Sequence, residues 1–103
     1  MISVCMATFN GEKYIKQQMD SILCQLSKDD EVIVSDDGSK DKTIQILEAY
    51  HDLRIKIFIN HGPHGFTKNF ENALKKCRGD IIFLSDQDDV WKKNKVDVSL
   101  EQL

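Results

Sequence analysis

Three carboxylates stand within four positions of one another near the end of the sequence. Asp86, Asp88 and Asp89 follow an apolar run at positions 81–84 that has the composition of a buried β-strand. Carboxylates this close repel one another unless a cation lies between them, and Mg²⁺ and Mn²⁺ prefer such oxygen ligands. Asp86 and Asp88 also fall on the same side of an extended chain. We therefore predict a Mn²⁺ or Mg²⁺ site at these two residues; the alternative is a solvated loop whose acids cap the next helix.

A second acidic pair, Asp36 and Asp37, follows another predicted strand at positions 31–35. We expect one carboxylate to serve the turn before the next helix and the other to accept hydrogen bonds from a ligand. A carboxylate suits a base edge or ribose hydroxyls, whereas it repels a phosphate. Lys68, at the start of a predicted helix, is a candidate for a phosphate contact, although a solvated lysine is the simpler interpretation.

Hydrophobic periodicity predicts that strands and helices alternate along the chain. Strands are expected at 2–7, 31–35, 54–59 and 81–85, and helices at 12–26, 42–50, 66–76 and 91–103. This order predicts an α/β protein with a Rossmann-like parallel β-sheet and flanking helices. Ligands of such sheets bind at the carboxyl ends of the strands. Thr8, the pair Asp36 and Asp37, and Asp86 should therefore lie along one edge.

Particular residues are expected to cap or orient the helices. Ser39 or Asp41 is a candidate N-cap for the second helix. Gly79 is expected to end the third helix in a left-handed conformation. On the third helix, Phe70 and Leu74 should lie on one face, with Phe66 and Ala73 beside them.

The composition limits the class of protein. The 103 residues are 41% hydrophobic and 30% charged with a net charge of −3, which suits one small soluble domain. The lysines form no basic block, so nucleic acid is not an expected partner, and no apolar run approaches the roughly 20 residues of a transmembrane segment. Cys5, Cys24 and Cys77 lack CxxC spacing, which predicts reduced packing residues of a cytoplasmic protein. The chain stops at Leu103 within a predicted helix, so we expect a truncated part of a larger protein.

Motifs of several other nucleotide-binding folds are absent from the sequence. Neither Gly-x-Gly-x-x-Gly after the first strand nor Gly-x-x-x-x-Gly-Lys-Ser/Thr occurs, which argues against a standard dinucleotide fold and a P-loop NTPase. His61 and His64 lie in a loop without cysteine partners, so we assign them no metal site. The alternatives are a sugar nucleotidyltransferase, a Mg²⁺-binding receiver-type module and a structural domain. The first strand ends in neither the Gly-rich basic loop nor the acids that the first two require.

Three strings follow one another at positions 3–11, 35–39 and 86–91, and they read SVCMATFNG, SDDGS and DQDDVW. Together they resemble glycosyltransferase family 2, and the resemblance covers essentially the whole chain. It implies an inverting enzyme with the GT-A nucleotide-diphospho-sugar transferase fold. The third string is similar to a bacterial subgroup that includes rhamnosyltransferases of surface-polysaccharide assembly.

The resemblance also implies roles for individual residues. Thr8 and Phe9 would line the base pocket of a UDP- or dTDP-linked donor sugar, and Asp37, with Asp36, would hold the base or ribose. The run at positions 86–88 matches the family's Asp-x-Asp. Asp88 would bind Mn²⁺ or Mg²⁺ at the diphosphate, with Asp86 near the ribose or the metal and Asp89 supporting. Lys68 would touch the diphosphate.

The sequence departs from the family pattern in two ways. Ala7 stands where many relatives have proline. The family's general base is a carboxylate of the acceptor half, and nothing up to Leu103 matches it. The resemblance therefore implies that residues 1–103 are the N-terminal nucleotide-sugar-binding portion and transfer no sugar alone. The acceptor would be a saccharide or lipid-linked, and the full-length protein would be cytoplasmic, peripheral at the inner face of the membrane.

Overall fold

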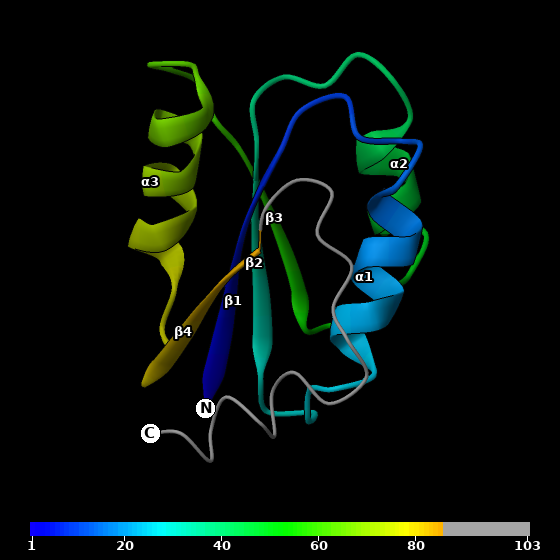
Figure 1. Ribbon diagram of the computed structural model, residues 1–103, viewed down its shortest axis with the longest axis vertical. Helices are drawn as coiled ribbons and strands as arrows, with labels where there is room; N and C mark the ends of the chain where they lie inside the picture. The colour runs from blue at the N-terminus through cyan, green and yellow to red at the C-terminus, as the bar shows by residue number, and fades with distance from the viewer. Residues whose placement is uncertain (86–103) are drawn as a thin grey trace.

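The computed structural model describes residues 1–85, and the predicted helix at 91–103 lies outside this part. Strands and helices alternate along the chain as predicted (Figure 1). The elements are β1 (Ile2–Thr8), α1 (Ile15–Leu23), β2 (Glu31–Asp36), α2 (Thr43–Glu48), β3 (Ile55–Ile59), α3 (Phe66–Lys76) and β4 (Ile81–Ser85). The helices lie on both sides of the sheet, with α1 and α2 on one face and α3 on the other (Figure 1).

The four strands form one sheet in the order β3-β2-β1-β4, and every pair of neighbours is parallel. The predicted parallel sheet is therefore confirmed. In the register, Thr8 at the end of β1 lies opposite Asp36 of β2. Ser85 at the end of β4 lies opposite Met6, two residues before the end of β1. The carboxyl ends of β1, β2 and β4 thus meet at one edge, where a parallel sheet places its ligand site.

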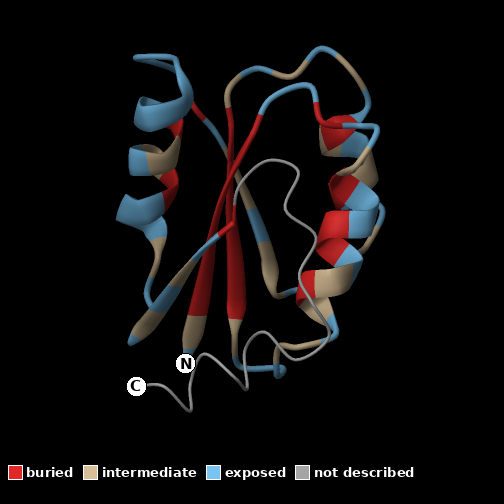
Figure 2. Ribbon diagram, in the orientation of Figure 1, coloured by how far each residue is buried: buried red, intermediate tan, exposed pale blue. Residues whose placement is uncertain are grey.

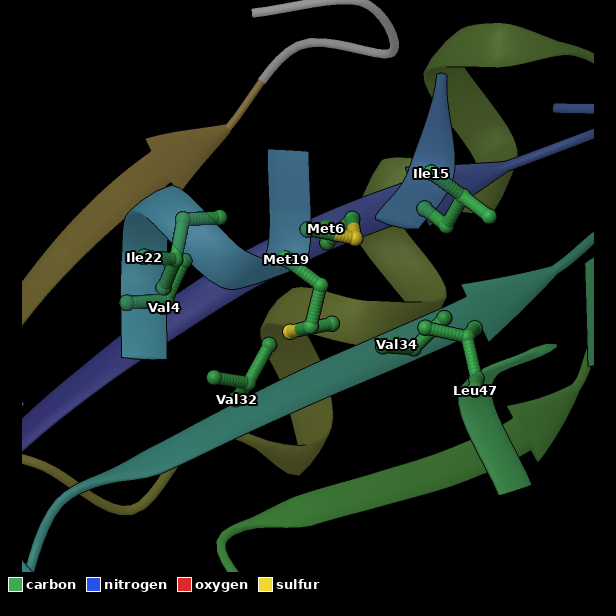
Figure 3. Close-up of a cluster of buried hydrophobic side chains, with 8 residues drawn as sticks. All are labelled: Val4, Met6, Ile15, Met19, Ile22, Val32, Val34 and Leu47. Carbon is green, nitrogen blue, oxygen red and sulfur yellow. The ribbon is translucent and has the colours of Figure 1, made fainter. Parts of the chain in front are cut away.

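The main core fills the space between the sheet and the pair α1 and α2. Alternate residues of β1 and β2 point into it and pack against apolar residues of the two helices, as Figure 3 shows. A smaller cluster of Cys5, Ile33 and Ala73 lies on the α3 side. Both central strands are therefore covered on both faces (Figure 2), which explains the apolar runs 4–7 and 32–34 in their middle.

The first helix is shorter than the predicted range 12–26. Before Ile15 the chain forms a turn whose N–H groups bind the loop that precedes α2 and the first residue of that helix. The N–H of Gly11 donates to Thr43 Oγ1 at 2.8 Å, and that of Glu12 donates to the Asp41 carboxylate at 3.1 Å. These tertiary bonds hold the segment in a turn, so the helix begins later than its periodicity indicates.

The predicted caps of α2 take a different form in the structure. Lys42 occupies the N-cap position and makes no side-chain cap bond. One residue earlier, Asp41 accepts a hydrogen bond from the Thr43 N–H at 3.0 Å. Ser39 instead donates to Asp36 at 2.6 Å. Asp41 therefore stabilises the start of the helix by a local Asx turn, whereas Ser39 belongs to the preceding loop.

The prediction of a left-handed Gly79 is wrong. Gly79 has no positive φ, and α3 is followed by an extended Cys77 with φ −70° and ψ 136°. Glycine is required here by a close approach instead. A Cβ at this position would lie 2.7 Å from both N and Oγ of Ser3 and 2.8 Å from the carbonyl oxygen of Met1. The Gly79 N–H donates to Ser3 Oγ at 2.7 Å, so the turn before β4 lies directly against the start of β1.

Cys5, Cys24 and Cys77 are free thiols. Cys5 is buried and Cys77 is partly buried, as expected of packing residues, whereas Cys24 is exposed, so the prediction is wrong for that residue. Among residues 1–85, no helix combines the length and apolar character needed to cross a bilayer.

Candidate functional site

Asp36, at the end of β2, is a buried carboxylate with 1% exposure. Its Oδ1 accepts from Thr8 Oγ1 at 2.7 Å and from Ser39 Oγ at 2.6 Å. Its Oδ2 accepts from the backbone N–H groups of Gly38 and Ser39 at 3.1 and 2.7 Å. These four bonds use the acceptor positions of both oxygens. Asp36 is therefore the member of the acidic pair that serves the turn.

Asp37 faces a different environment, and its side chain is 12% exposed. Oδ1 accepts from Asn60 Nδ2 at 3.0 Å and contacts His64 Nδ1 at 2.6 Å, while Oδ2 accepts from the Gly65 N–H at 2.9 Å. Partial burial alone would raise the pKa of Asp37, but the hydrogen bonds from Gly65, His64 and Asn60 outweigh it and hold the pKa below its ordinary value. Asp37 is thus ionised at neutral pH, and Oδ2 keeps one acceptor position for a ligand.

The segment 60–65 that binds Asp37 is itself ordered by internal hydrogen bonds. Asn60 is buried, donates through Nδ2 to the Pro63 carbonyl at 2.9 Å and accepts from the Gly62 N–H at 3.2 Å. Its own N–H donates to the Asp36 carbonyl at 2.7 Å. Gly65 has φ 113°, a conformation that favours glycine, and directly precedes α3.

Sequence reasoning assigned His64 no role, yet the structure places it against Asp37. Its ring nitrogen lies 2.6 Å from a carboxylate 27 positions away, a contact that only the fold creates. Asn69 of α3 was also missed. Asn69 is buried, donates to the Thr8 carbonyl at 3.2 Å and accepts from Ser35 Oγ at 2.7 Å. In the sequence, Asn69 could have been recognised as a polar residue on the sheet-facing side of a predicted helix.

A hollow of about 250 Å³ opens at the carboxyl edge of the sheet. Thr8, Phe9 and Asp37, three of the predicted base-pocket residues, come together in its lining. The remaining lining residues are Ala7, Gly65, Phe66 and Asn69. Phe9 and Phe66 are exposed aromatic side chains, which offer apolar faces to a planar ligand. The hollow therefore combines aromatic surface with one ionised hydrogen-bond acceptor, a pairing suited to a heterocyclic base.

Lys68 does not line this hollow. It is an exposed residue of the first turn of α3, and its Nζ lies 3.4 Å from Glu71 Oε2. A surface pair of this kind contributes little to stability, so the side chain is readily available to another anion. A phosphate contact by Lys68 stays a prediction.

The predicted metal ligands Asp86 and Asp88 lie outside the described residues, as does Asp89. Within residues 1–85, no group of three or more His, Cys, Asp or Glu side chains is placed to hold a metal ion. The strand that precedes these acids is firmly positioned. Ser85 is buried and accepts a hydrogen bond from Gln18 Nε2 of α1 at 2.9 Å. β4 therefore ends toward the edge of the sheet that holds the hollow. The metal site at Asp86 and Asp88 stays a prediction.

A second hollow, of about 300 Å³, lies between α3 and β4 and has an apolar lining. It includes Phe66, Phe70, Leu74 and Leu84, together with Cys5, Thr67 and Glu71. Phe66 and Leu74 are exposed, whereas Asn69 and Ala73 are the buried residues of α3. Small or polar residues at these two positions let α3 approach the strands closely, and the larger apolar side chains lie to the side. This groove offers no charge partner for a phosphate.

The family model described as glycosyl transferase family 2 matches residues 3–103, and the chain belongs to this family. The dTDP-rhamnosyl transferase RfbG of Shigella flexneri is 38% identical over 106 residues, which cover 95% of this chain and 36% of that relative. The chain thus spans about a third of the length of such relatives.

Solved structures agree with the fold. S. aureus TarS, residues 1–349, in complex with UDP-GlcNAc superimposes with a TM-score of 0.84 at 34% identity, over 97% of this chain and 30% of that one. Glucosyl-3-phosphoglycerate synthase from Mycobacterium tuberculosis, in complex with Mn²⁺, UDP and glucosyl-3-phosphoglycerate, gives a TM-score of 0.72 at 27% identity, over 84% of this chain and 33% of that one. The described sheet and helices therefore have the GT-A fold, as predicted.

Proposed function

We propose that residues 1–103 form the nucleotide-sugar-binding portion of an inverting glycosyltransferase. The observation that carries this proposal is the hollow at the carboxyl edge of the sheet, which joins Thr8, Phe9 and Asp37. The likeness to TarS, whose structure contains UDP-GlcNAc, supports a nucleotide-diphospho-sugar as the ligand.

The chemistry of the hollow favours a base with an N–H donor. Asp37 is ionised and offers only acceptors, so it binds an N–H or O–H group and repels a phosphate. Uracil and thymine each present an N–H on the ring edge, and a ribose presents hydroxyls. A UDP- or dTDP-linked donor fits this requirement, with its base against Phe9 and its polar edge at Asp37. Asp36 supports the site by fixing the β2 tip.

The predicted metal ligands complete the donor site. Asp86 and Asp88 would hold Mn²⁺ or Mg²⁺, and a divalent cation bound there supplies positive charge to the departing nucleoside diphosphate. The Mn²⁺ and UDP in the M. tuberculosis synthase structure support this assignment. Lys68 would add a second positive charge near the diphosphate.

Transfer with inversion requires an acceptor hydroxyl to lose a proton to a base and attack the anomeric carbon opposite the departing diphosphate. We assign no residue of this chain to the base, which we expect beyond Leu103. The proposed acceptor is a saccharide or lipid-linked saccharide of bacterial surface polysaccharide, and the full-length protein would act in the cytoplasm at the inner face of the membrane. Since only donor and metal binding are assigned to residues 1–103, we expect this chain to transfer no sugar alone.

Calorimetric titration tests the donor site. The wild-type chain is titrated with UDP, dTDP, GDP and ADP, each with and without Mn²⁺, and so are Asp37→Asn and Asp88→Asn. Asp80→Asn is the control, because Asp80 is exposed and lies beside Met1, at the opposite end of the sheet. We expect Mn²⁺-dependent binding of UDP or dTDP that both site variants weaken and the control retains. Absence of binding by all four nucleotides, or equal binding by Asp37→Asn and wild type, would contradict the proposal.

A further inference from the structure

All three hydrogen bonds to the Asp37 carboxylate come from one short segment. Asn60 Nδ2 and His64 Nδ1 contact Oδ1 at 3.0 and 2.6 Å, and the Gly65 N–H reaches Oδ2 at 2.9 Å. We call Asn60, His64 and Gly65 the Asp37 clip. Both Asp37 and Gly65 line the hollow, so the clip connects a surface loop directly to the ligand site.

The members of the clip differ in what else they do. Asn60 is buried and also bonds Pro63 and Gly62, so it builds the loop itself. Gly65 contributes a backbone N–H and begins α3. The His64 side chain is 61% exposed, and its polar contact within residues 1–85 is the bond to Asp37. Among the three residues of the clip, His64 therefore contributes least to packing and yet makes the shortest contact with the carboxylate.

We propose that His64 is a positioning residue for nucleotide recognition, which orients the Asp37 carboxylate toward the base; this inference rests on the proposed function. Two donors occupy Oδ1 and one occupies Oδ2, so the unfilled acceptor position lies on Oδ2. Loss of His64 opens a second position on Oδ1, and the carboxylate then has two competing orientations for the same ligand N–H. A ligand that needs one orientation of the Asp37 carboxylate then binds more weakly, because the protein molecules with the other orientation must change before they bind.

Two substitutions separate the hydrogen bond from the ring. His64→Asn keeps a side-chain N–H close to the place of Nδ1, whereas His64→Ala removes it. For UDP or dTDP with Mn²⁺, we expect His64→Ala to raise Kd by about 5- to 10-fold, the size of the net contribution of one ordinary hydrogen bond. His64→Asn should stay within about 2-fold of wild type. His61→Ala, in the same loop, is the matched control and should bind as wild type does.

A second ligand distinguishes positioning from general damage to the fold. Inorganic pyrophosphate with Mn²⁺ has no base, so its affinity should be the same in wild type and His64→Ala. The urea midpoint should also be unchanged, because the ring is mostly exposed. Equal losses for UDP and pyrophosphate, or a lowered midpoint that accounts for the loss, would overturn the inference and leave His64 a structural role.

The results also separate this inference from the proposed function. If wild type binds UDP or dTDP and Asp37→Asn weakens binding while His64→Ala does not, the donor site stands and the role of His64 is wrong. If wild type binds none of the nucleotides, the proposed function fails and the inference fails with it.

Discussion

Thr8 Oγ1 donates a hydrogen bond of 2.7 Å to Asp36 Oδ1 and so joins the tips of the two central strands. Both residues are buried, and they lie opposite each other in the register of β1 and β2. The bond fixes the edge of the sheet from which Asp37, the next residue, faces the hollow. The two adjacent acids therefore have different roles. Asp36 stabilises the edge of the sheet, and Asp37 is available to bind the ligand.

This difference predicts that one substitution mainly lowers stability and the matched one mainly weakens nucleotide binding. Asp36→Asn replaces an acceptor of four internal hydrogen bonds by a group that also donates, so we expect the free energy of unfolding to fall by about 3 kcal/mol. Asp37→Asn, at a more exposed position, should cost about 1 kcal/mol and mainly weaken nucleotide binding. Urea unfolding measures the first effect and calorimetry the second. A larger stability loss for Asp37→Asn would contradict the assignment.

A buried carboxylate at the other end of the sheet should make stability depend on pH. Glu31 accepts from Ser3 Oγ at 2.6 Å, the Arg78 N–H at 2.8 Å and Lys56 Nζ at 3.0 Å. Burial alone would raise its pKa, but these bonds from Ser3, Arg78 and Lys56 outweigh burial and lower the pKa below its ordinary value. Its contribution is therefore present above the unfolded-state pKa of about 4.3 and is lost as pH falls through the folded-state pKa.

Comparison of wild type with Glu31→Gln tests this dependence. At pH 7 the variant should be less stable by about 3 kcal/mol, because it leaves Lys56 without its partner and disturbs a buried network. The difference should shrink at pH 3.5, where protonation begins to remove the same interaction from wild type. Urea unfolding at pH 7, 5 and 3.5 measures it, with the exposed Glu12→Gln as control. A constant difference at all three pH values would show that the ionised form is not what stabilises the fold.

Gly79→Ala should destabilise the protein through a steric clash. The added Cβ would lie within 2.8 Å of backbone atoms of Ser3 and Met1. Ser3 belongs to the central strand β1, and Met1 directly precedes that strand. Overpacking of this kind costs about 1–3 kcal/mol. Gly38→Ala provides the comparison, since Gly38 has φ 89° with nothing within 4 Å of its Cβ position and so tests conformational strain alone. Thermal or urea unfolding should rank Gly79→Ala as the less stable of the two variants. If Gly79→Ala were as stable as wild type, the close approach would be refuted.

Thiol labelling should distinguish the three cysteines. Burial, with Cys77 nearby, raises the pKa of the Cys5 thiol to about 12, so almost no thiolate is present at pH 8. Cys24 is exposed. Iodoacetamide at pH 8 should therefore modify Cys24 first, and Cys5 only after unfolding in urea, with mass spectrometry of peptides as the readout. Rapid modification of Cys5 in the folded protein would contradict its burial.

The raised pKa of Cys5 also has a consequence for stability in alkali. The folded state binds the thiol proton more tightly than the unfolded state, so this contribution is fully present below about pH 9 and declines as pH rises toward 12. Cys5→Ser should be less stable than wild type at pH 7, because it places a hydroxyl in an apolar cluster, and less sensitive to pH between 9 and 11. Urea unfolding over that range measures the two slopes. Equal slopes would show that Cys5 does not titrate with unfolding.

The order of elements and the parallel sheet were predictable from the sequence, because both depend on local hydrophobic periodicity and on the rule that short alternating elements form right-handed crossovers. The same rule placed Thr8 and Asp37 at one edge, and the hollow contains both. Helix limits and special glycines were less predictable. The start of α1 depends on bonds from Gly11 and Glu12 to the segment 41–43, about 30 positions away, and a glycine is required at position 79 by the close approach to Ser3.

The sequence alone therefore determined the fold class, the edge that carries the site and the residue types available there, since these follow from patterns within one segment at a time. Only the tertiary structure decided which acid of the pair remains available to a ligand. Thr8 and Ser39 use the acceptor positions of Asp36, while His64 and its loop hold Asp37 with one position open. Such an assignment depends on hydrogen bonds between residues far apart in the chain, whose distances and directions exist only after the strands have packed.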